Sequence, residues 1–250
     1  MEEKKSIRGI PVAKVIPLRG IHKKVAENLV QSHLAAAGVT TFKEMDVTEI
    51  VRLKGQLAVR SDLPGGLKIS YTHMMIKAIA HALREHLVLN STLIGDEVHV
   101  FEDINIGMAV ALPDGNLIVP VIHQADQKNI LEIAQRALDL QERAKIRKLT
   151  LPDVQKGTFT LTNLGMVPEA RWGTPLINQE QCAILETGAI RQIPVVKGGQ
   201  VVIRWIITIS MTYDHRIVNG VPVAHFMVTL AQILNDPAKL DWGINIHLNS

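Results

Sequence analysis

Helical and extended sequence patterns follow one another along this 250-residue chain without regular alternation. Residues 72–86 and 129–145 place apolar side chains every three or four positions, which predicts two strongly amphipathic helices. Three further helices are expected at 21–38, 48–59 and 221–234, and Thr48 is a possible cap of the second of them. Extended segments are expected at 40–47, 67–71, 98–101, 104–112, 117–122, 158–162, 181–190, 194–196 and 201–209. This order favours an α/β or α+β fold with a largely mixed sheet.

The chain divides into a short arm and one long domain. Residues 1–17 are polar and interrupted by proline, which predicts an N-terminal arm that is either disordered or held by a neighbouring subunit. Residues 18–250 show no repeat, no low-complexity tract and no shift in composition. We therefore expect them to form a single domain.

The composition excludes several classes of protein. A formal charge of +3, 4% aromatic residues and short basic runs predict no nucleic-acid partner. The apolar runs are too short for a membrane span, so no membrane partner is expected. Cys182 is the single cysteine, which excludes a disulfide framework and favours a reducing compartment. The ten histidines include no His-x-x-x-His pair beside a carboxylate, so no metal is expected. We expect a cytoplasmic location, or the mitochondrial matrix for a processed eukaryotic chain.

One polar cluster interrupts the longest apolar strand. The alternating run 207–213 leads into Asp214-His215-Arg216, and Asn219-Gly220 follows as a turn or helix start. An imidazole at a strand end has a fixed backbone and titrates in the range useful for acid–base chemistry. The alternative is structural: Asp214 and Arg216 pair with partners elsewhere, His215 is solvated, and Asn219 is a helix N-cap.

A second stretch, Gly157 to Gly165, ends a predicted strand in Thr162-Asn163-Leu164-Gly165. Such an end can present a hydroxyl group and a tight turn to a cleft. The pattern alone also fits an ordinary strand end followed by turn residues.

Taken together, these stretches resemble the catalytic domain of the dihydrolipoamide acyltransferases, the core component of the 2-oxo acid dehydrogenase complexes. The family signature is an Asp-His-Arg run with Asp or Asn four residues after the histidine, followed by Gly. Residues 214–220 fit that signature. Further stretches fit the family in its order and spacing from about residue 16 to 240: 18–24, 45–48, 105–110, 114–121 and 157–165.

The resemblance implies a chloramphenicol-acetyltransferase-like two-layer α/β fold with a mixed sheet. It also implies a homotrimer with active sites in channels between neighbours, assembled further into a larger cage that is the core of a multienzyme complex. Dihydrolipoamide would enter one end of the channel and coenzyme A the other. The lipoyl group would be supplied by a lipoyl domain that is not present in this chain, and other subunits of a dehydrogenase complex would be partners.

The family's catalytic roles transfer to three positions. The resemblance makes His215 the general base that takes the proton of the coenzyme A thiol. Thr162 stands where the family usually carries a serine that donates to the carbonyl oxygen, and threonine adds a methyl group that restricts its rotamers. Asn219 stands where many members carry aspartate, and because an amide has no charge we expect it to order the site by hydrogen bonds.

Six further positions match family positions near coenzyme A: Lys54, Ser70, Gln141, Asn163, Gly188 and Ile190. Lys54 is a credible partner for a phosphate, although Lys54 and Gln141 also fit plain solvated helix residues. Ala111 departs from relatives that carry aspartate there, so one polar contact is missing.

Two alternatives to an active acyltransferase remain open. Ala111 and Thr162 fit an assembly scaffold with weak or lost activity, which the presence of His215 opposes. An antibiotic O-acetyltransferase of the same fold typically carries His-His where Asp214-His215 stands. The acyl group is open, because acetyl, succinyl and branched-chain transferases share these motifs.

Overall fold

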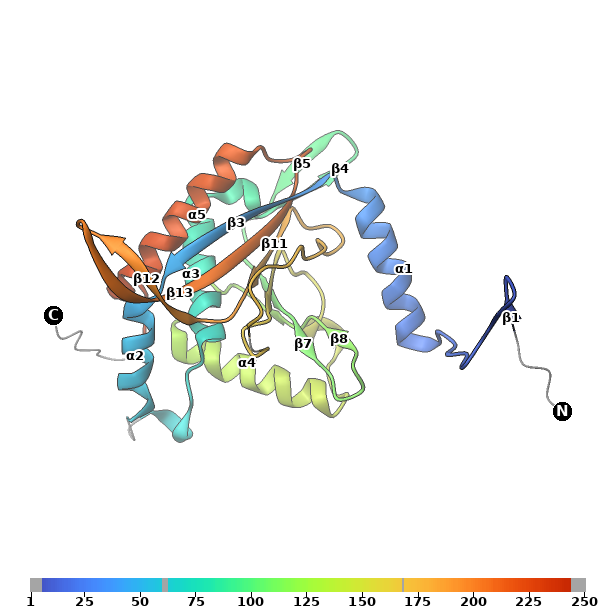
Figure 1. The fold of residues 1–250 in the computed structure, drawn as a ribbon, viewed down its shortest axis with the longest axis horizontal. Coiled ribbons are helices and arrows are strands. Elements are labelled where there is room, and N and C mark those ends of the chain that lie inside the picture. The colour runs from blue at the N-terminus through green and yellow to red at the C-terminus, as the bar shows by residue number, and fades with distance from the viewer. Residues whose placement is uncertain (1–5, 60–62, 168, 244–250) are drawn as a thin grey trace.

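The fold is a mixed β-sheet covered on one face by helices, and the computed structural model describes residues 6–59, 63–167 and 169–243 (Figure 1). The seven-stranded sheet has the order β12-β13-β11-β10-β6-β9, and β3 also pairs with β13. Its strands are β3 (Gly38–Asp46), β6 (Ile106–Met108), β9 (Val121–Ile122), β10 (Phe159–Asn163), β11 (Ala183–Thr187), β12 (Arg191–Lys197) and β13 (Gln200–Asp214). β10 runs parallel to β6 and β11, and the other pairs are antiparallel. The predicted mixed sheet is confirmed.

Strict alternation along β13 explains why the sheet has one apolar and one polar face. Its odd-numbered residues from Ile207 to Tyr213 are buried in the hydrophobic core. The even-numbered positions on the other face are Thr208, Ser210, Thr212 and Asp214. Because side chains alternate between the faces of a strand, one face packs against helices and the other presents hydroxyl groups.

Helices α2 (Thr48–Ala58), α3 (Tyr71–Glu85), α4 (Ile130–Lys145) and α5 (Gly220–Asn235) cover the apolar face. The interior of α3 is almost wholly buried, and it packs between α4 and α5. Its predicted apolar stripe is therefore confirmed as the centre of the core.

Helix α1 (Gly20–Ala35) projects from this body together with the short pair β1 (Ser6–Ile7) and β2 (Ile10–Pro11) (Figure 1). It exposes the apolar side chains Leu29, Val30 and Leu34. A groove of about 1110 Å³ lies along α1 and the body. Residues 1–5 of the predicted arm and 244–250 of the predicted domain lie outside the described residues, and the boundary at residue 17 stays a prediction.

Several element predictions need correction. The strand pair β4 (Ser91–Ile94) and β5 (Glu97–Val100) includes a strand that was not predicted, and the segment 67–71 contains no strand. Helix α2 begins at Thr48, and the preceding Asp46 carboxylate accepts hydrogen bonds from its amide and hydroxyl groups, so Thr48 is not the N-cap. Strand β13 runs to Asp214 because β3 pairs with it to that point and β11 pairs with it as far as Tyr213.

Proline breaks two of the predicted strands. The expected strand 104–112 divides into β6 and β7 (Val110–Ala111), and 117–122 divides into β8 (Leu117–Ile118) and β9. The break falls where Met108 faces Pro120: the Met108 amide donates to the Pro120 carbonyl at 2.8 Å, and proline has no N–H to return the bond.

Neither membrane spans nor metal clusters are found within the described part of the chain. None of its helices is long and apolar enough to cross a bilayer. No group of three or more His, Cys, Asp or Glu side chains there is arranged to hold a metal ion.

Candidate active site

The turn that carries His215 is held by its two charged neighbours. The Asp214 carboxylate accepts bonds from the Arg216 amide at 3.0 Å, from the Arg216 guanidinium at 2.6 Å and from the Ala37 amide at 3.2 Å. The His215 amide donates to the Ala37 carbonyl at 2.9 Å. Burial opposes ionisation of Asp214, but the bonds from Arg216 outweigh it and lower the pKa of the carboxyl group. Asp214 and Arg216 therefore pair with each other, and their pairing fixes the backbone of His215.

The His215 ring is exposed in the single chain and lies 5.7 Å from the ring of Tyr213. Asn219 occupies the N-cap position of α5, but its side chain makes no capping hydrogen bond. A cavity of about 750 Å³, lined in part by Ala36, Asp214 and Ile217, adjoins this turn. The imidazole and the amide are thus open to a ligand or a second copy of the chain.

Thr162 lies near the end of β10 on the polar face of the sheet. Its register partner on β11 is Glu186, which in turn faces Ser210 on β13. The next residue, Asn163, points to the helical layer: its amide donates to the Thr72 hydroxyl at 2.9 Å, and its carbonyl oxygen accepts from the Gly165 amide at 2.7 Å.

Within one chain, His215 and Thr162 lie at opposite ends of the sheet. Thr162 is level with Ser210, because both are in register with Glu186. His215 lies five residues beyond Ser210, which at about 3.3 Å per residue is about 17 Å along the strand. One chain alone therefore cannot bring these two side chains to the same reacting atoms.

The start of α3 gathers three of the residues predicted to lie near coenzyme A. Ser70 caps this helix by accepting from the His73 amide at 3.3 Å, and Asn163 bonds to its Thr72. The Lys54 ammonium lies 5.0 Å from the centre of the Tyr71 ring. A helix N-terminus with a lysine beside it favours an anion.

The other three predicted residues lie nearby on the sheet and on α4. Gln141 contacts the Met108 sulfur at 3.6 Å, and Met108 is on β6, the strand next to β10. Gly188 directly follows β11, and Ile190 is half-buried against the core. All six lie toward the end of the sheet that holds Thr162, away from His215.

Two groups that could be mistaken for catalytic residues have structural roles. Burial raises the pKa of the Cys182 thiol to about 12, so it is a poor nucleophile. Burial lowers the pKa of His73 to about 4, and its ring accepts a bond from the Ser70 amide as part of the helix cap.

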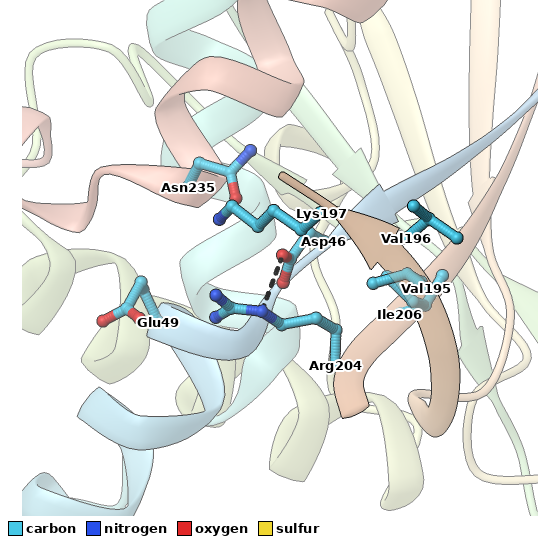
Figure 2. Close-up of a pocket in the computed structure, with 8 residues that line it drawn as sticks. All are labelled: Asp46, Glu49, Val195, Val196, Lys197, Arg204, Ile206 and Asn235. Carbon is cyan, nitrogen blue, oxygen red and sulfur yellow. Dashed lines mark ion pairs between the residues drawn. The ribbon is translucent and has the colours of Figure 1, made fainter. Parts of the chain in front are cut away.

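One buried carboxyl group in this region, Glu186, is the register partner of Thr162 and was not predicted from the sequence. A charged residue within the otherwise apolar and hydroxyl-bearing run 183–187 of the predicted strand 181–190 is the signal that could have revealed it. A pocket of about 540 Å³ between the β12–β13 hairpin and α2 was not predicted either, and in it Arg204 lies 3.8 Å from Asp46 (Figure 2). None of the predicted site residues lines that pocket.

The model of one protein family, the 2-oxoacid dehydrogenases acyltransferase (catalytic domain), matches residues 11–241. The chain belongs to this family. Among its members, a succinyltransferase component of the 2-oxoglutarate dehydrogenase complex from Haemophilus influenzae is 34% identical over 91% of this chain and 55% of its own length. An acetyltransferase component of the pyruvate dehydrogenase complex from Mycoplasma capricolum is also 34% identical, over 90% of this chain and 51% of its own. The chain thus spans about half the length of these curated family members.

Solved structures of family members share the fold. A probable dihydrolipoamide acetyltransferase from Listeria monocytogenes has a TM-score of 0.87 and 31% identity, and covers 94% of this chain and 98% of its own. The acetyltransferase of Azotobacter vinelandii has a TM-score of 0.86 and 30% identity over 91% of this chain and 93% of its own. That structure was studied for the role of a serine, a histidine and an asparagine in catalysis, the last two being four residues apart. A chloramphenicol acetyltransferase, 14% identical over 83% of this chain and 94% of its own with a TM-score of 0.52, confirms the predicted two-layer fold.

Proposed function

We propose that this chain is an acyltransferase domain that moves an acyl group between S-acyl-dihydrolipoamide and coenzyme A. It would form the core of a 2-oxo acid dehydrogenase complex, with lipoyl groups presented by lipoyl domains. The family match over residues 11–241 carries the proposal, since that range includes the rigid Asp214–Arg216 turn, His215 and Thr162. His215 and Asn219 are four residues apart, as are the histidine and asparagine studied in the Azotobacter vinelandii member.

The chemistry starts from a thiol that is mostly protonated. A free thiol has a pKa of about 8.5, so only a few per cent is thiolate at neutral pH. His215 takes the proton from coenzyme A, and the sulfur attacks the thioester carbonyl. When the tetrahedral intermediate collapses, the carbon–sulfur bond to dihydrolipoamide breaks and the protonated imidazole returns the proton to the leaving sulfur. General-base help of this kind contributes about 10²- to 10⁴-fold to the rate.

Thr162 would stabilise the negative charge that develops on the carbonyl oxygen. Its hydroxyl donates one hydrogen bond, and removal of such a donor costs about 3–4 kcal/mol of transition-state stabilisation. Asn219 would order the imidazole and its surroundings. Because both substrates bind at once, no acyl-enzyme forms, which agrees with the high pKa of the Cys182 thiol.

We infer that the active site forms between two copies of the chain. The separation of His215 and Thr162 within one chain supports this, because His215 of one copy must meet Thr162 of another. A homotrimer closes such contacts in a ring, and further association gives the cage. The projecting α1, with its exposed apolar side chains, offers a surface for a neighbouring copy.

Coenzyme A would bind at the end of the sheet that holds Thr162. Lys54 and the start of α3 favour the phosphates, and Ser70, Gln141, Asn163, Gly188 and Ile190 lie within the same region. We place the protein in the cytoplasm, or in the mitochondrial matrix, because curated relatives of the chain include both bacterial and mitochondrial complex components.

The proposal is tested by turnover with acyl-coenzyme A and free dihydrolipoamide. We expect His215→Ala to lower the rate at least about 100-fold while light scattering shows an unchanged assembly. His225→Ala is the matched control, because His225 is also an exposed histidine but lies on α5 and does not line the cavity beside the His215 turn. An unchanged rate in His215→Ala would contradict the role of general base, and faster acetylation of chloramphenicol than of the thiol would favour an antibiotic acetyltransferase.

A further inference from the structure

Glu186 is a buried carboxyl group in the middle of the sheet. Its side chain is on β11, and only 7% of the residue is exposed. Its register partners are Thr162 on β10 and Ser210 on β13, so the three side chains lie on the same face. Neighbouring strands are about 4.8 Å apart, so the side chains of Glu186 and Thr162 leave the sheet at adjacent positions.

The surroundings of Glu186 cover its carboxyl group but supply no compensating charge. The backbone of Gly173 crosses directly over it, and a Cβ at Gly173 would lie 2.1 Å from the carboxylate oxygen. Within the described residues, no ion pair includes Glu186, and burial raises its pKa. Arg171 lies in the covering loop, residues 169–173, but it is exposed and lies 3.7 Å from Glu169 instead.

An unpaired buried carboxylate is expensive for the fold, because the charge loses water without gaining a partner. A neutral side chain of the same shape would fill the space beneath Gly173 at lower cost. A buried group that costs stability in this way is typical of a functional site.

Resting on the proposed function, we propose that Glu186 selects the acyl group: it rejects chains that carry their own carboxylate, such as succinyl, and admits uncharged chains, such as acetyl. When Thr162 holds the acyl carbonyl oxygen, the acyl chain lies beside Glu186. A second carboxylate there would face a like charge in a site poor in water, where repulsion is strong. The family includes both succinyl- and acetyltransferase components, so membership alone leaves this choice open.

The experiment compares kcat/KM for acetyl-coenzyme A and succinyl-coenzyme A, with dihydrolipoamide as acceptor, in the assembled protein. We expect the unmodified chain to favour acetyl by at least about 100-fold, and Glu186→Gln to lower that ratio at least about 10-fold, mainly by raising succinyl transfer. Glu186→Gln keeps the shape of the side chain and removes its charge. Glu44→Gln is the matched control and should leave the ratio unchanged. Glu44 lies on β3 with Thr208 of β13 as its register partner, but its side chain is exposed.

Three different outcomes would overturn the inference, and the experiment distinguishes them from one another. An unchanged ratio in an active Glu186→Gln variant shows that Glu186 only fills space. An equal loss of kcat/KM with both donors shows that Glu186 supports the site as a whole and does not select the acyl group. Absence of transfer from either donor by the unmodified chain defeats the proposed function, and this inference with it.

Discussion

Gly188 has a packing reason to be glycine that is separate from any contact with coenzyme A. A Cβ there would lie 2.2 Å from the Thr208 hydroxyl and 2.5 Å from the Arg171 carbonyl oxygen. We expect Gly188→Ala to lower the free energy of unfolding by about 1–3 kcal/mol, because the covering loop must shift to make room. Gly55→Ala is the control: Gly55 is inside α2 with nothing near its missing Cβ, so alanine should stabilise by about 0.5–1 kcal/mol. Urea unfolding of the two variants measures both effects, and equal stabilities would contradict the packing argument.

At the scale of single residues, the sequence predicts a functional side chain where the residue type itself is distinctive. It does not predict one whose role depends on which residues lie beside it in space. His215 stands out because a polar cluster interrupts a long apolar strand, and the structure shows Asp214 and Arg216 holding that turn. Glu186 was missed because its importance comes from register with Thr162, which depends on pairing between distant segments. The placement of Asn163 toward α3 follows in the same way from alternation along β10.

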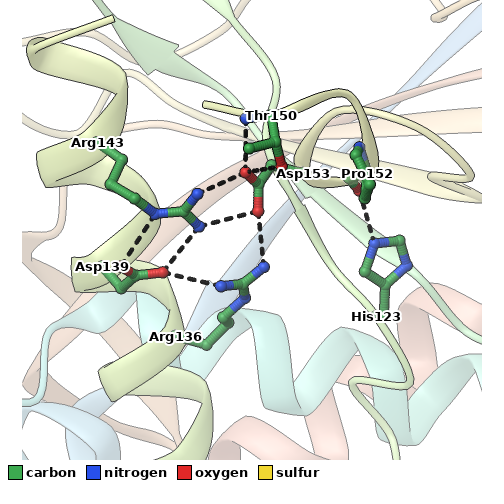
Figure 3. Close-up of polar contacts among 7 residues, drawn as sticks. All are labelled: His123, Arg136, Asp139, Arg143, Thr150, Pro152 and Asp153. Carbon is green, nitrogen blue, oxygen red and sulfur yellow. Dashed lines mark hydrogen bonds and ion pairs between the residues drawn. The ribbon is translucent and has the colours of Figure 1, made fainter. Parts of the chain in front are cut away.

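At the scale of elements, a charged network joins α4 to the turn before β10 (Figure 3). The buried Asp153 carboxylate accepts from Arg143 at 2.5 and 2.8 Å, from Arg136 at 2.8 Å and from the Thr150 amide at 2.7 Å. Asp139, on the exposed side, bonds to the same two arginines. The network thus fixes the approach of the chain to the strand that carries Thr162.

We expect Asp153→Asn to lower the free energy of unfolding at neutral pH by about 2 kcal/mol, because charge-assisted bonds become neutral ones. The bond from Arg143 is the main cause that lowers the pKa of Asp153 in the folded protein. The contribution of the carboxylate is therefore complete above its ordinary pKa of about 3.9 and is lost as the pH falls below that value. Asp139→Asn, at the exposed end of the same network, should cost less than about 1 kcal/mol. Unfolding curves at pH 7 and pH 3 measure both, and a difference between Asp153→Asn and the parent that does not shrink at pH 3 would contradict the assignment.

Helices were easier to predict than strands for a physical reason. The stripes of α3 and α4 are local patterns, and their predicted bounds agree with the structure to within one residue. Strand ends depend on the partner: β13 extends to Asp214 because β3 pairs with it up to that residue. The break between β6 and β7 likewise depends on Pro120, a residue of the opposite strand, which no single-strand pattern contains.

At the scale of the whole molecule, the sheet separates the two halves of the proposed chemistry. The end with Thr162 also gathers the residues predicted for coenzyme A, and the other end carries His215 and Asn219. The proposed reaction therefore requires two copies of the chain, with the His215 end of one sheet next to the Thr162 end of the other. The geometry of one chain therefore makes a direct prediction about assemblies of two different variants.

Two inactive variants should restore activity when they share one assembly. His215→Ala keeps Thr162, and Thr162→Val keeps His215, so a site at which the two variants meet in the correct order has both intact groups. With random mixing, half of the copies supply an imidazole and half supply a hydroxyl, so about one quarter of the sites are complete. We expect co-expressed variants to show about a quarter of the parental turnover per site, measured with acetyl-coenzyme A and dihydrolipoamide, whereas the same variants purified apart and then mixed stay inactive. Activity in neither preparation would mean that His215 and Thr162 act within one chain or do not act together, because only a site built from two copies can be repaired by exchange of copies.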